Sequence, residues 1–316
     1  MSAFYDLASL AKPLVTAPLA LAFLDLDADR RWALGFHDRE APLTVRQLLS
    51  HRSGLPPWRP FTGEALAAQL RHPVPEHPLL RPATPGLSTY SDLNYRLLGE
   101  LLEQETGVPF ARLGAASGLV AAPWPAAPVP IPDAPDAEAW RLAAGQDPPP
   151  QAPGQPHDAN ARAGMRGHAG FGTSAEGLSE ALRRWVAAGW ADRMAVDTAE
   201  GEQGARWGLG LQRLRRGPGN FGQLLADCPA GLGVAVVECA EDALAAPAPP
   251  LVEGPFSDWW FHFGYTGPAL FYRPADQACL ALLLHRRGPE GELLEAEAVR
   301  ARRWEALARF VGQSAG

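Results

Sequence analysis

Three strand-like segments follow one another near the carboxyl end of the chain: His262–Thr266, Ala269–Arg273 and Cys279–Arg287. They are rich in aromatic and β-branched or other apolar residues, and the sequence RPAD at 273–276 predicts a turn between the last two. Strands joined by such short connections pair antiparallel. An amphipathic helix is predicted over Leu293–Val311, where it would cover the resulting sheet.

The part of the chain before these strands is rich in helical patterns. Leucines at 93, 97, 98, 101 and 102 share one helical face, which predicts a helix over Tyr90–Gly107. Further helices are predicted over Leu43–Gly54, Phe61–Arg71 and Thr173–Gly189. In Leu43–Gly54, Thr44 is a candidate N-cap with Gln47 three residues later.

This order of elements predicts an α+β protein, in which an antiparallel sheet is flanked by helices and carries an inserted, mainly helical region. We expect residues 1–24 and 200–316 to form the part that contains the sheet. Residues 25–199 would form the helical part. Within it, residues 121–156 are too rich in proline for regular helix or sheet and are expected to form a long irregular loop.

The composition of the 316-residue chain excludes several classes of function. A net charge of -7 argues against a nucleic-acid interface. The longest apolar run, Pro13–Leu24, is too short to span a bilayer, although a signal peptide with Lys12 as its basic end is an alternative interpretation. The three cysteines form no close pair, and the eight histidines show no metal-binding spacing. We therefore expect neither a metal nor a cofactor.

One lysine, Lys12, stands among 28 basic residues, and all the others are arginines. If a helix starts at Ser9 and runs through the apolar stretch, Lys12 lies one turn later on the same face as Ser9. A serine hydroxyl needs a base beside it to act as a nucleophile, and a lysine can serve if burial or nearby positive potential destabilises its ammonium. Arginine cannot replace it, because the guanidinium does not deprotonate in proteins.

Four further segments occur in the order that is typical of one enzyme superfamily. "LTVRQLLSHRSGLP" begins at Leu43, "YSDLNYRLLGELL" at Tyr90, "HDANARAGMRGHAGFGTSAEGL" at His157 and "HFGYTGPALFYRPADQACLALLLHRR" at His262. Together with the Ser-x-x-Lys sequence at Ser9, they resemble the motifs of the serine β-lactamase and penicillin-binding-protein superfamily, and in particular its class C-related hydrolases and esterases.

The resemblance implies roles for the matching residues. Ser9 would be the acylated nucleophile, Lys12 would activate it and Tyr90 would share the proton transfers. His262 and Gly264 match the third motif, and the backbone N–H of Tyr265 would join that of Ser9 in an oxyanion hole. Asp92 stands where the family often has asparagine, and either a role in the site or the capping of a helix start would explain it.

Two residue types bear on the substrate. Phe263 occupies the position where the family usually has threonine or serine, a residue that helps to bind a substrate carboxylate, so the resemblance favours an esterase over a β-lactamase. Trp124, Trp259 and Trp260 are candidates for a substrate cleft, with packing against loops as the alternative. His157 and His168 are interpreted as loop anchors.

The family normally has an N-terminal helix and two sheet strands before its nucleophile, whereas Met1 stands only eight residues before Ser9. Without those strands, the apolar strand that begins at Cys279 would be an exposed sheet edge. Either the true start lies upstream, or the segment Gly231–Ala240 supplies a replacement strand. Localisation stays open in the same way: cytoplasmic if Met1 is the true start, and periplasmic or secreted if a signal segment precedes it.

We therefore expect a serine hydrolase that acts through an acyl-enzyme on a small-molecule ester, amide or peptide, with no nucleic-acid partner. The alternative hypothesis is a truncated, catalytically weak member that binds acyl or peptidoglycan-like ligands. Completion of the sheet beside Ser9 discriminates between the two. The sequence does not give the oligomeric state.

Overall fold

A computed structural model describes most of the chain. The described residues are 4–59, 63–71, 86–116, 122–123, 158, 160–161, 164–217, 219–239, 254–286 and 294–314. The proline-rich segment, His157 and Trp124 lie outside them, apart from the two residues of the short strand β2 (Ala122–Pro123). The predictions for that segment therefore stay predictions.

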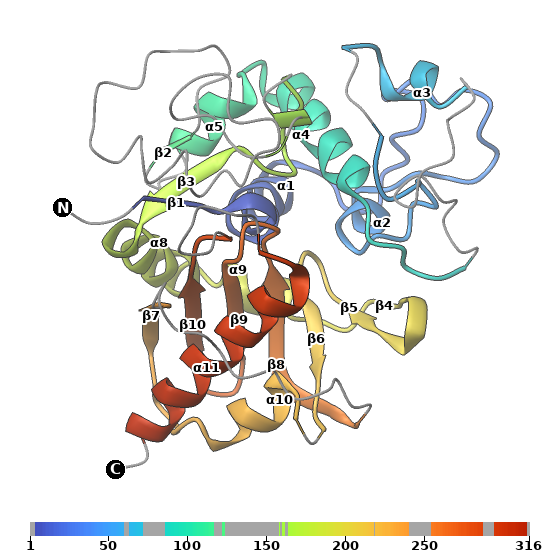
Figure 1. Cartoon of the computed structure of the whole chain (residues 1–316). Coiled ribbons are helices and arrows are strands. Elements are labelled where there is room, and N and C mark those ends of the chain that lie inside the picture. Colours follow the sequence, from blue (N-terminus) through green and yellow to red (C-terminus); the bar gives the residue numbers. More distant parts are fainter. Residues whose placement is uncertain are drawn as a thin grey trace.

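A seven-stranded sheet forms the lower half of the molecule as seen in Figure 1. Its strand order is β4-β5-β6-β8-β9-β10-β7. The strands are β4 (Ala199–Glu200), β5 (Arg206–Trp207), β6 (Gln212–Arg215), β7 (Val234–Glu238), β8 (Phe256–Phe263), β9 (Ala269–Arg273) and β10 (Ala278–Leu283). All neighbours pair antiparallel except β10 and β7, which are parallel.

Strand β7 solves the edge problem that the sequence raised. It pairs with β10 from Cys279 opposite Val234 to Leu283 opposite Glu238. The segment Gly231–Ala240 therefore supplies the replacement strand, which was one of the two alternatives for the missing neighbour of β10. Because β7 occupies the outer position, the fully buried apolar strand β10 is not an exposed sheet edge.

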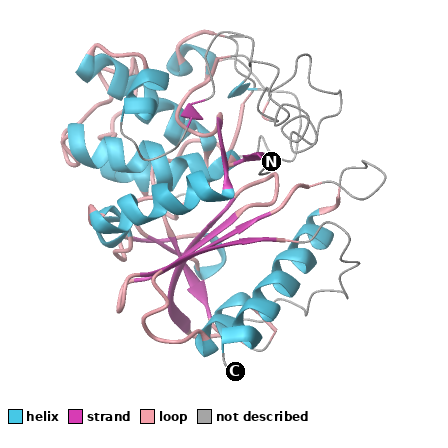
Figure 2. Cartoon of the chain, turned by 90° about the vertical axis from the view of Figure 1, so that its left-hand side faces the viewer, coloured by secondary structure: helices cyan, strands magenta, loops and turns pink. Residues whose placement is uncertain are grey.

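Two hydrophobic cores lie on the two faces of this sheet. Along β9 and β10, Leu270, Tyr272, Cys279 and Ala281 belong to one core, while Phe271, Leu280 and their alternating neighbours belong to the other. This follows from the two-residue period of a strand, which sends successive side chains to opposite faces. Helices therefore cover both faces, as Figure 2 shows. Helix α8 (Ala175–Ala187) packs on one face and α11 (Ala296–Ser314) on the other.

The first core continues into a helical region above the sheet (Figure 1). Its helices are α1 (Ala17–Phe23), α2 (Val45–Leu49), α3 (Leu66–Gln69), α4 (Asp92–Thr106) and α5 (Phe110–Ala116). Helix α9 (Trp190–Met194) follows α8 and lies against the sheet, where Asp192 accepts a hydrogen bond from the Tyr272 hydroxyl of β9. Two short helical turns, α10 (Phe221–Leu224) and η5 (Leu225–Asp227), pack with α11 in the second core, and η4 (Glu202–Gly204) follows β4. The predicted capping box of Thr44 and Gln47 is present at α2.

Some boundaries differ from the prediction. The first of the three closing strands, β8, begins at Phe256, six residues before the predicted start, and ends at Phe263. The helix predicted over 61–71 is only the single turn α3. A small sheet of order β1-β3-β2 was not predicted at all: β1 (Phe4–Asp6) pairs antiparallel with β3 (Phe171–Ser174).

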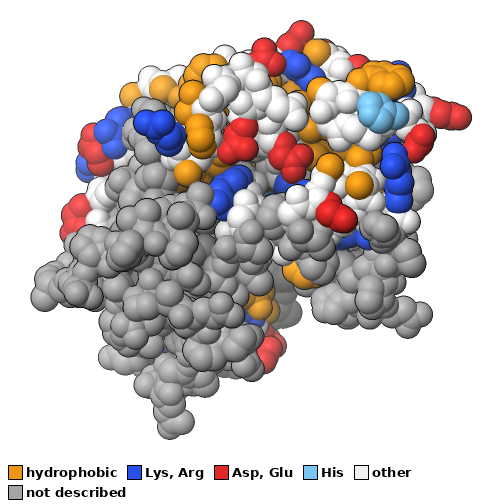
Figure 3. Space-filling model, turned by 90° about the horizontal axis from the view of Figure 1, so that it is seen from above, with side chains coloured by type: hydrophobic (Ala, Val, Ile, Leu, Met, Phe, Trp, Pro, Cys, Tyr) orange, Lys and Arg blue, Asp and Glu red, His pale blue; other side chains and the backbone are white. Residues whose placement is uncertain are grey.

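Seen from above, acidic and basic side chains are interspersed with apolar ones on the visible surface of the described residues (Figure 3). No helix in the described part of the chain combines the length and the apolar character that crossing a bilayer requires.

Candidate active site

Ser9 lies in a helical stretch that changes its geometry twice. It belongs to the 3₁₀ turn η1 (Ala8–Leu10), which is followed by the π-helix η2 (Lys12–Thr16) and then by α1. Pro13 and Pro18 lack backbone N–H groups, so neither can donate the hydrogen bond that a regular α-helix would require at its position. Short π segments inside helices are frequent at functional sites. The predicted proximity of Ser9 and Lys12 holds, but a single regular helix does not.

The backbone just before Ser9 is strained. Ala8 has φ of 45°, a left-handed conformation that is costly for a residue with a Cβ. Its N–H donates to Asp6 Oδ1 at 2.7 Å, and Asp6 O accepts a 2.8 Å bond from Thr266 Oγ1. The buried Asp6 thus holds this tight turn and joins it to the segment that follows β8.

Lys12 is fully buried and its ammonium has three polar neighbours. Its Nζ donates to Ser9 Oγ at 2.8 Å and to the backbone oxygen of His168 at 2.9 Å, and it lies 2.7 Å from Asp92 Oδ1. Burial lowers the pKa of Lys12, but the carboxylate of Asp92, with a smaller contribution from Tyr90, outweighs it, so the pKa is raised. Lys12 is therefore an ammonium at neutral pH. Burial destabilises this charged form, as the sequence predicted, but the attraction of Asp92 more than offsets that destabilisation.

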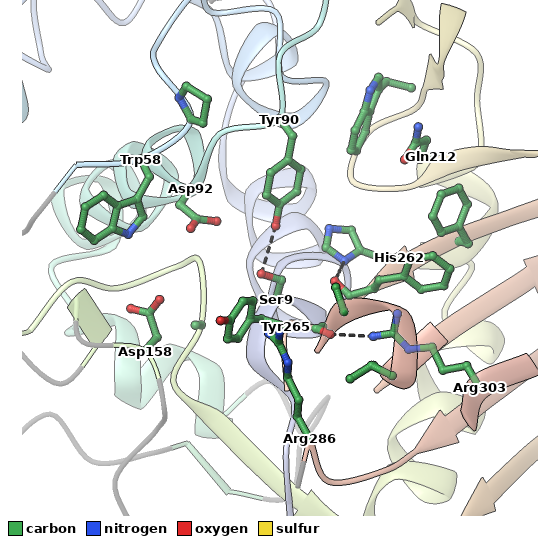
Figure 4. Close-up of a pocket in the computed structure, with 18 residues that line it drawn as sticks. Ser9, Trp58, Tyr90, Asp92, Asp158, Gln212, His262, Tyr265, Arg286 and Arg303 are labelled. Atoms are coloured by element: carbon green, nitrogen blue, oxygen red, sulfur yellow. Dashed lines mark hydrogen bonds between the residues drawn. The ribbon is translucent and has the colours of Figure 1, made fainter. Parts of the chain in front are cut away.

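Tyr90 and Asp92 reach the site from the start of α4. Ser91 caps this helix by accepting a bond from Leu93 N, which leaves Tyr90 just before the helix and Asp92 in its first turn. The Tyr90 hydroxyl donates to Ser9 Oγ at 3.0 Å (Figure 4). Burial is the largest cause that raises the pKa of Tyr90, while Lys12 opposes it, so the hydroxyl is protonated at neutral pH.

The His51 imidazole packs against the Tyr90 ring. Its Nδ1 accepts a bond of 3.1 Å from Ser91 N, which places the ring proton on Nε2. The imidazole lies 4.8 Å from the Tyr90 ring and 4.7 Å from the Trp207 ring between centroids. Burial is the main cause that holds the pKa of His51 well below its usual range, so the ring is neutral. Sequence reasoning placed His51 in a family motif but assigned it no role.

The end of β8 approaches Ser9 from the other side. Gly264 lies so close to the turn that precedes Ser9 that an added Cβ would stand 2.9 Å from Leu7 O and 2.7 Å from Pro268 Cγ. His262 is buried, and its Nδ1 is 3.1 Å from Phe263 O. Burial, assisted by Lys12, lowers the pKa of His262 to about 3, so this side chain is neutral as well. Tyr265 follows Gly264 and is 56% exposed.

Arg303 of α11 holds the turn between β8 and β9. Its Nε donates to Gly267 O at 2.6 Å, and one terminal nitrogen donates to Gly264 O at 2.7 Å and to Pro268 O at 3.2 Å. Its guanidinium also lies 4.5 Å from the centre of the Phe263 ring. The Phe263 ring therefore packs against the Arg303 guanidinium.

These groups open into a pocket of about 710 Å³. Ser9 lies near its centre, with Asp92 and Asp158 on one side and His262 and Arg303 on the other (Figure 4). Its lining tryptophans are Trp58 and Trp207. The cleft interpretation of Trp259 and Trp260 is wrong, because both are buried in the cores on the two sides of β8.

Three side chains that could act as metal ligands border the site. Ligand atoms of Asp92, Asp158 and His168 lie within 4.8 Å of one another, a spacing that could hold a metal ion. The Lys12 ammonium already supplies a positive charge there, 2.7 Å from Asp92. His168 Nε2 lies 2.9 Å from Asp158 Oδ1, while its backbone oxygen binds Lys12, which agrees with its interpretation as an anchor.

The structure brings together six of the seven predicted site residues in the pocket lining, and the seventh, Lys12, is hydrogen-bonded to Ser9. Sequence reasoning missed Asp158, Trp58, Trp207, Arg286 and Arg303 as lining residues. Asp158 and Arg286 both lie within quoted motifs, so a signal was present for each. Trp58, Trp207 and Arg303 enter the lining only through contacts between distant segments.

Comparison with known proteins places these features in context. A family model described as Beta-lactamase matches residues 4–303. A class C beta lactamase from Rhodobacter sphaeroides is similar over 98% of this chain and 86% of that one, with 19% identity and a TM-score of 0.62. The D-amino acid amidase from Ochrobactrum anthropi SV3, in complex with L-phenylalanine amide, is similar over 100% and 85%, with 16% identity and a TM-score of 0.56.

SurE in complex with D-Leu is also similar, with 21% identity and a TM-score of 0.57 over 99% of this chain. The chain spans 64% of the length of SurE. At these identities the likeness shows the fold, which is the α+β fold that the sequence predicted. No curated protein sequence matches the chain significantly.

Proposed function

Because the chain belongs to the beta-lactamase family, we propose that it is a serine hydrolase that cleaves an ester or amide through an acyl-enzyme on Ser9. The observation that carries the proposal is the environment of Ser9 Oγ, which accepts hydrogen bonds from Lys12 Nζ at 2.8 Å and from the Tyr90 hydroxyl at 3.0 Å. A serine flanked by two proton-transfer groups is the arrangement that nucleophilic catalysis requires.

Lys12 and Asp92 act together in the first step of the proposed mechanism. Lys12 passes a proton across the 2.7 Å contact to Asp92 and takes the Ser9 proton as the oxygen attacks the substrate carbonyl. A substrate that excludes water from the pocket favours this exchange, because a neutral acid–amine pair loses less hydration than an ion pair. The proton count is conserved, since Asp92 gains the proton that Ser9 loses.

Tyr90 completes the acylation. Its raised pKa keeps it protonated, so it can donate to the leaving group when the tetrahedral intermediate collapses. Lys12 then returns a proton to the tyrosine oxygen. In deacylation the same groups act in reverse order on a water molecule, which attacks the acyl carbonyl and releases Ser9.

The negative oxygen of the intermediate needs hydrogen-bond donors. We assign this role to the backbone N–H groups of Ser9 and Tyr265, with His262 and Gly264 shaping the strand end that carries Tyr265. Gly264 supports the assignment, because a residue without a Cβ lets this strand end lie against the turn that precedes Ser9.

Esters and simple amides are favoured over β-lactams as substrates. Phe263 replaces the hydroxyl residue of the family motif, and it packs beneath Arg303 without a hydroxyl to offer a ligand. Two of the similar structures contain D-Leu or L-phenylalanine amide, so amino-acid amides and esters belong in a first substrate panel.

A broken sheet beside Ser9 would favour the alternative hypothesis, a truncated binding protein. The strands β6, β8, β9, β10 and β7 form one continuous sheet, which supports the enzyme.

A fluorophosphonate probe tests the proposal directly. We expect intact-mass analysis to show one adduct on the native protein, none on Ser9→Ala and strongly slowed labelling of Lys12→Arg, since an arginine cannot accept the serine proton. An absence of adduct on folded native protein, confirmed by circular dichroism, would refute the hydrolase mechanism.

A further inference from the structure

The buried Asp6 connects the turn that precedes Ser9 to the turn that follows β8. Its backbone oxygen accepts a hydrogen bond of 2.8 Å from Thr266 Oγ1, and its side-chain Oδ1 accepts one of 2.7 Å from Ala8 N. Asp6 and Thr266 are each 1% exposed, so solvent does not compete for these bonds. One residue therefore joins two segments that lie far apart in the sequence.

The two connected residues neighbour the two backbone N–H groups that we assign to the oxyanion hole. Thr266 directly follows Tyr265, and Asp6 stands three residues before Ser9. Ser9 lies in the first turn of its helical stretch, where a backbone N–H has no acceptor within the helix. Because one donor comes from each segment, their spacing depends on how the two segments are joined.

That spacing has little tolerance. An oxyanion donor is effective at about 2.7–3.1 Å from the developing negative oxygen, and a catalytic constellation has to be held to within about 0.5 Å. The strain at Ala8 makes the requirement more severe, because its φ of 45° is a conformation that alanine leaves unless a contact holds it. The bond from Ala8 N to Asp6 Oδ1 is such a contact, so the direction of the backbone at Ser9 depends on the Asp6 side chain.

Other contacts fix the two segments to their surroundings and not to each other. Arg303 binds backbone oxygens of the turn after β8, among them Gly267 O. Leu7 N, on the other segment, donates to Phe171 O of β3 at 3.0 Å. The Thr266 hydroxyl differs from both, because it links the two segments directly.

We propose that Asp6 and Thr266 are positioning residues that fix the backbone of Ser9 against that of Tyr265 and so set the geometry of the oxyanion hole. The assignment of that hole rests on the proposed function. Neither Asp6 nor Thr266 lines the pocket, so they act on the reaction through the backbone that they hold. Loss of either should therefore weaken the binding of the tetrahedral state in protein that is still folded.

Thr266→Val tests the connection, because valine keeps the branched shape and lacks the hydroxyl. On 4-nitrophenyl acetate we expect kcat/KM per active site to fall about 10- to 100-fold, since removal of a whole oxyanion donor costs about 10²- to 10³-fold and its displacement costs less. Thr266→Ser keeps the hydroxyl and should recover most of the loss. Thr106→Val is the control: its hydroxyl donates to Leu102 O at 2.6 Å at the end of α4, away from the pocket lining, and its kinetics should equal those of the native protein.

Inhibition by phenylboronic acid separates positioning from a loss of folded protein. The inhibitor forms a tetrahedral adduct on a reactive serine, so its inhibition constant should rise in Thr266→Val by about the factor by which kcat/KM falls. A purely structural defect lowers the fraction of protein that fluorophosphonate titrates and leaves this constant unchanged. An unchanged constant in Thr266→Val, or an equal rise in Thr106→Val, would overturn the proposal.

Ala8→Gly tests the contribution of Asp6. Glycine adopts the left-handed conformation without steric cost, so the backbone then depends less on the Asp6 side chain. We expect Asp6→Ala to slow fluorophosphonate labelling about 10- to 100-fold, Asp6→Asn to stay within about threefold of the native rate, and Asp6→Ala/Ala8→Gly to regain at least about half of the loss on a logarithmic scale. A double variant as slow as Asp6→Ala would refute the hold of Asp6 on Ala8.

Amide hydrogen exchange gives a readout without catalysis. In Thr266→Val we expect mass spectrometry to show faster exchange in peptides that cover residues 4–10 and 262–268 together, and unchanged exchange in peptides from α4. Faster exchange confined to residues 262–268 would refute the connection. This result decides whether the two segments hold each other even if fluorophosphonate labelling of the native protein refutes the proposed hydrolysis.

Discussion

Lys12 Nζ and Asp92 Oδ1 lie 2.7 Å apart, with the lysine fully buried and the aspartate side chain 17% exposed. The contact joins the helical stretch that carries Ser9 and Lys12 to the first turn of α4, eighty residues away in the sequence. It also determines the charge of the lysine, because Asp92 raises a pKa that burial alone would lower.

Asp92→Asn tests this contact. With the carboxylate gone, burial dominates and the pKa of Lys12 falls, so we expect the variant to lose about 3 kcal/mol of stability at neutral pH. In the native protein the raised pKa stabilises the fold below pH 10.5, and that contribution is lost as the pH rises further. Urea unfolding from pH 8 to 11 should therefore show the gap between the two proteins narrowing. Parallel curves would contradict the assignment.

Tyr90→Phe removes one hydroxyl from the site. We expect kcat on a 4-nitrophenyl ester to fall about 10²- to 10⁴-fold, because the leaving group loses its proton donor. Stability should change by only about 1 kcal/mol, since the ring keeps its contacts with His51 and Trp207. Tyr95→Phe is the matched control: its hydroxyl donates to Leu49 O at 3.3 Å and does not touch Ser9. Similar kinetics for the two variants would exclude the role of Tyr90.

Gly264→Ala pushes the end of β8 away from the nucleophile turn. The new Cβ would stand 2.7 Å from Pro268 Cγ and 2.9 Å from Leu7 O, so we expect a loss of about 1–3 kcal/mol and slow fluorophosphonate labelling. Gly312→Ala on α11 is the control, because no atom lies within 4 Å of its Cβ and alanine favours a helix. Normal labelling of Gly264→Ala would show that the close approach is dispensable.

Asp276→Asn tests the turn between β9 and β10. Arg273 binds both oxygens of Asp276, at 2.8 and 2.7 Å, and this pairing lowers the pKa of Asp276 to about 2. The stabilisation is present above the usual pKa near 3.8 and is lost as the pH falls toward 2. Because the group is partly exposed to solvent, we expect the variant to be about 1 kcal/mol less stable at pH 7. Thermal melts should converge with the native protein near pH 2; a constant offset would contradict this account.

The sequence predicted the elements that have a strong period or an obligatory partner. The leucine pattern of α4 and the RPAD turn are local signals, and both are confirmed. Strand β7 was one of two solutions to a physical problem, because an apolar strand such as β10 needs a neighbour. The three-residue strand β1 was missed, since so short a segment carries no measurable alternation.

The site was predictable where chemistry restricts the residue type. Ser9 and Lys12 stood out because a serine nucleophile needs a titratable amine beside it, whereas Tyr90 followed from the resemblance of its segment to a family motif. The structure places both Lys12 and Tyr90 in hydrogen-bond contact with Ser9. Arg286 and Arg303 were not predicted as site residues. Their place in the pocket lining depends on how α11 and the end of β10 pack, which no local sequence pattern shows.

Because Arg303 fixes the turn after β8, this side of the pocket depends on a residue that is synthesised long after Ser9. Arg303, which fixes Gly264, Gly267 and Pro268, follows Ser9 by 294 residues in the sequence. While those residues are being synthesised, Ser9 is present without the strand end that faces it in the folded protein. A ribosome that stalls before residue 303 therefore leaves the pocket around Ser9 unassembled.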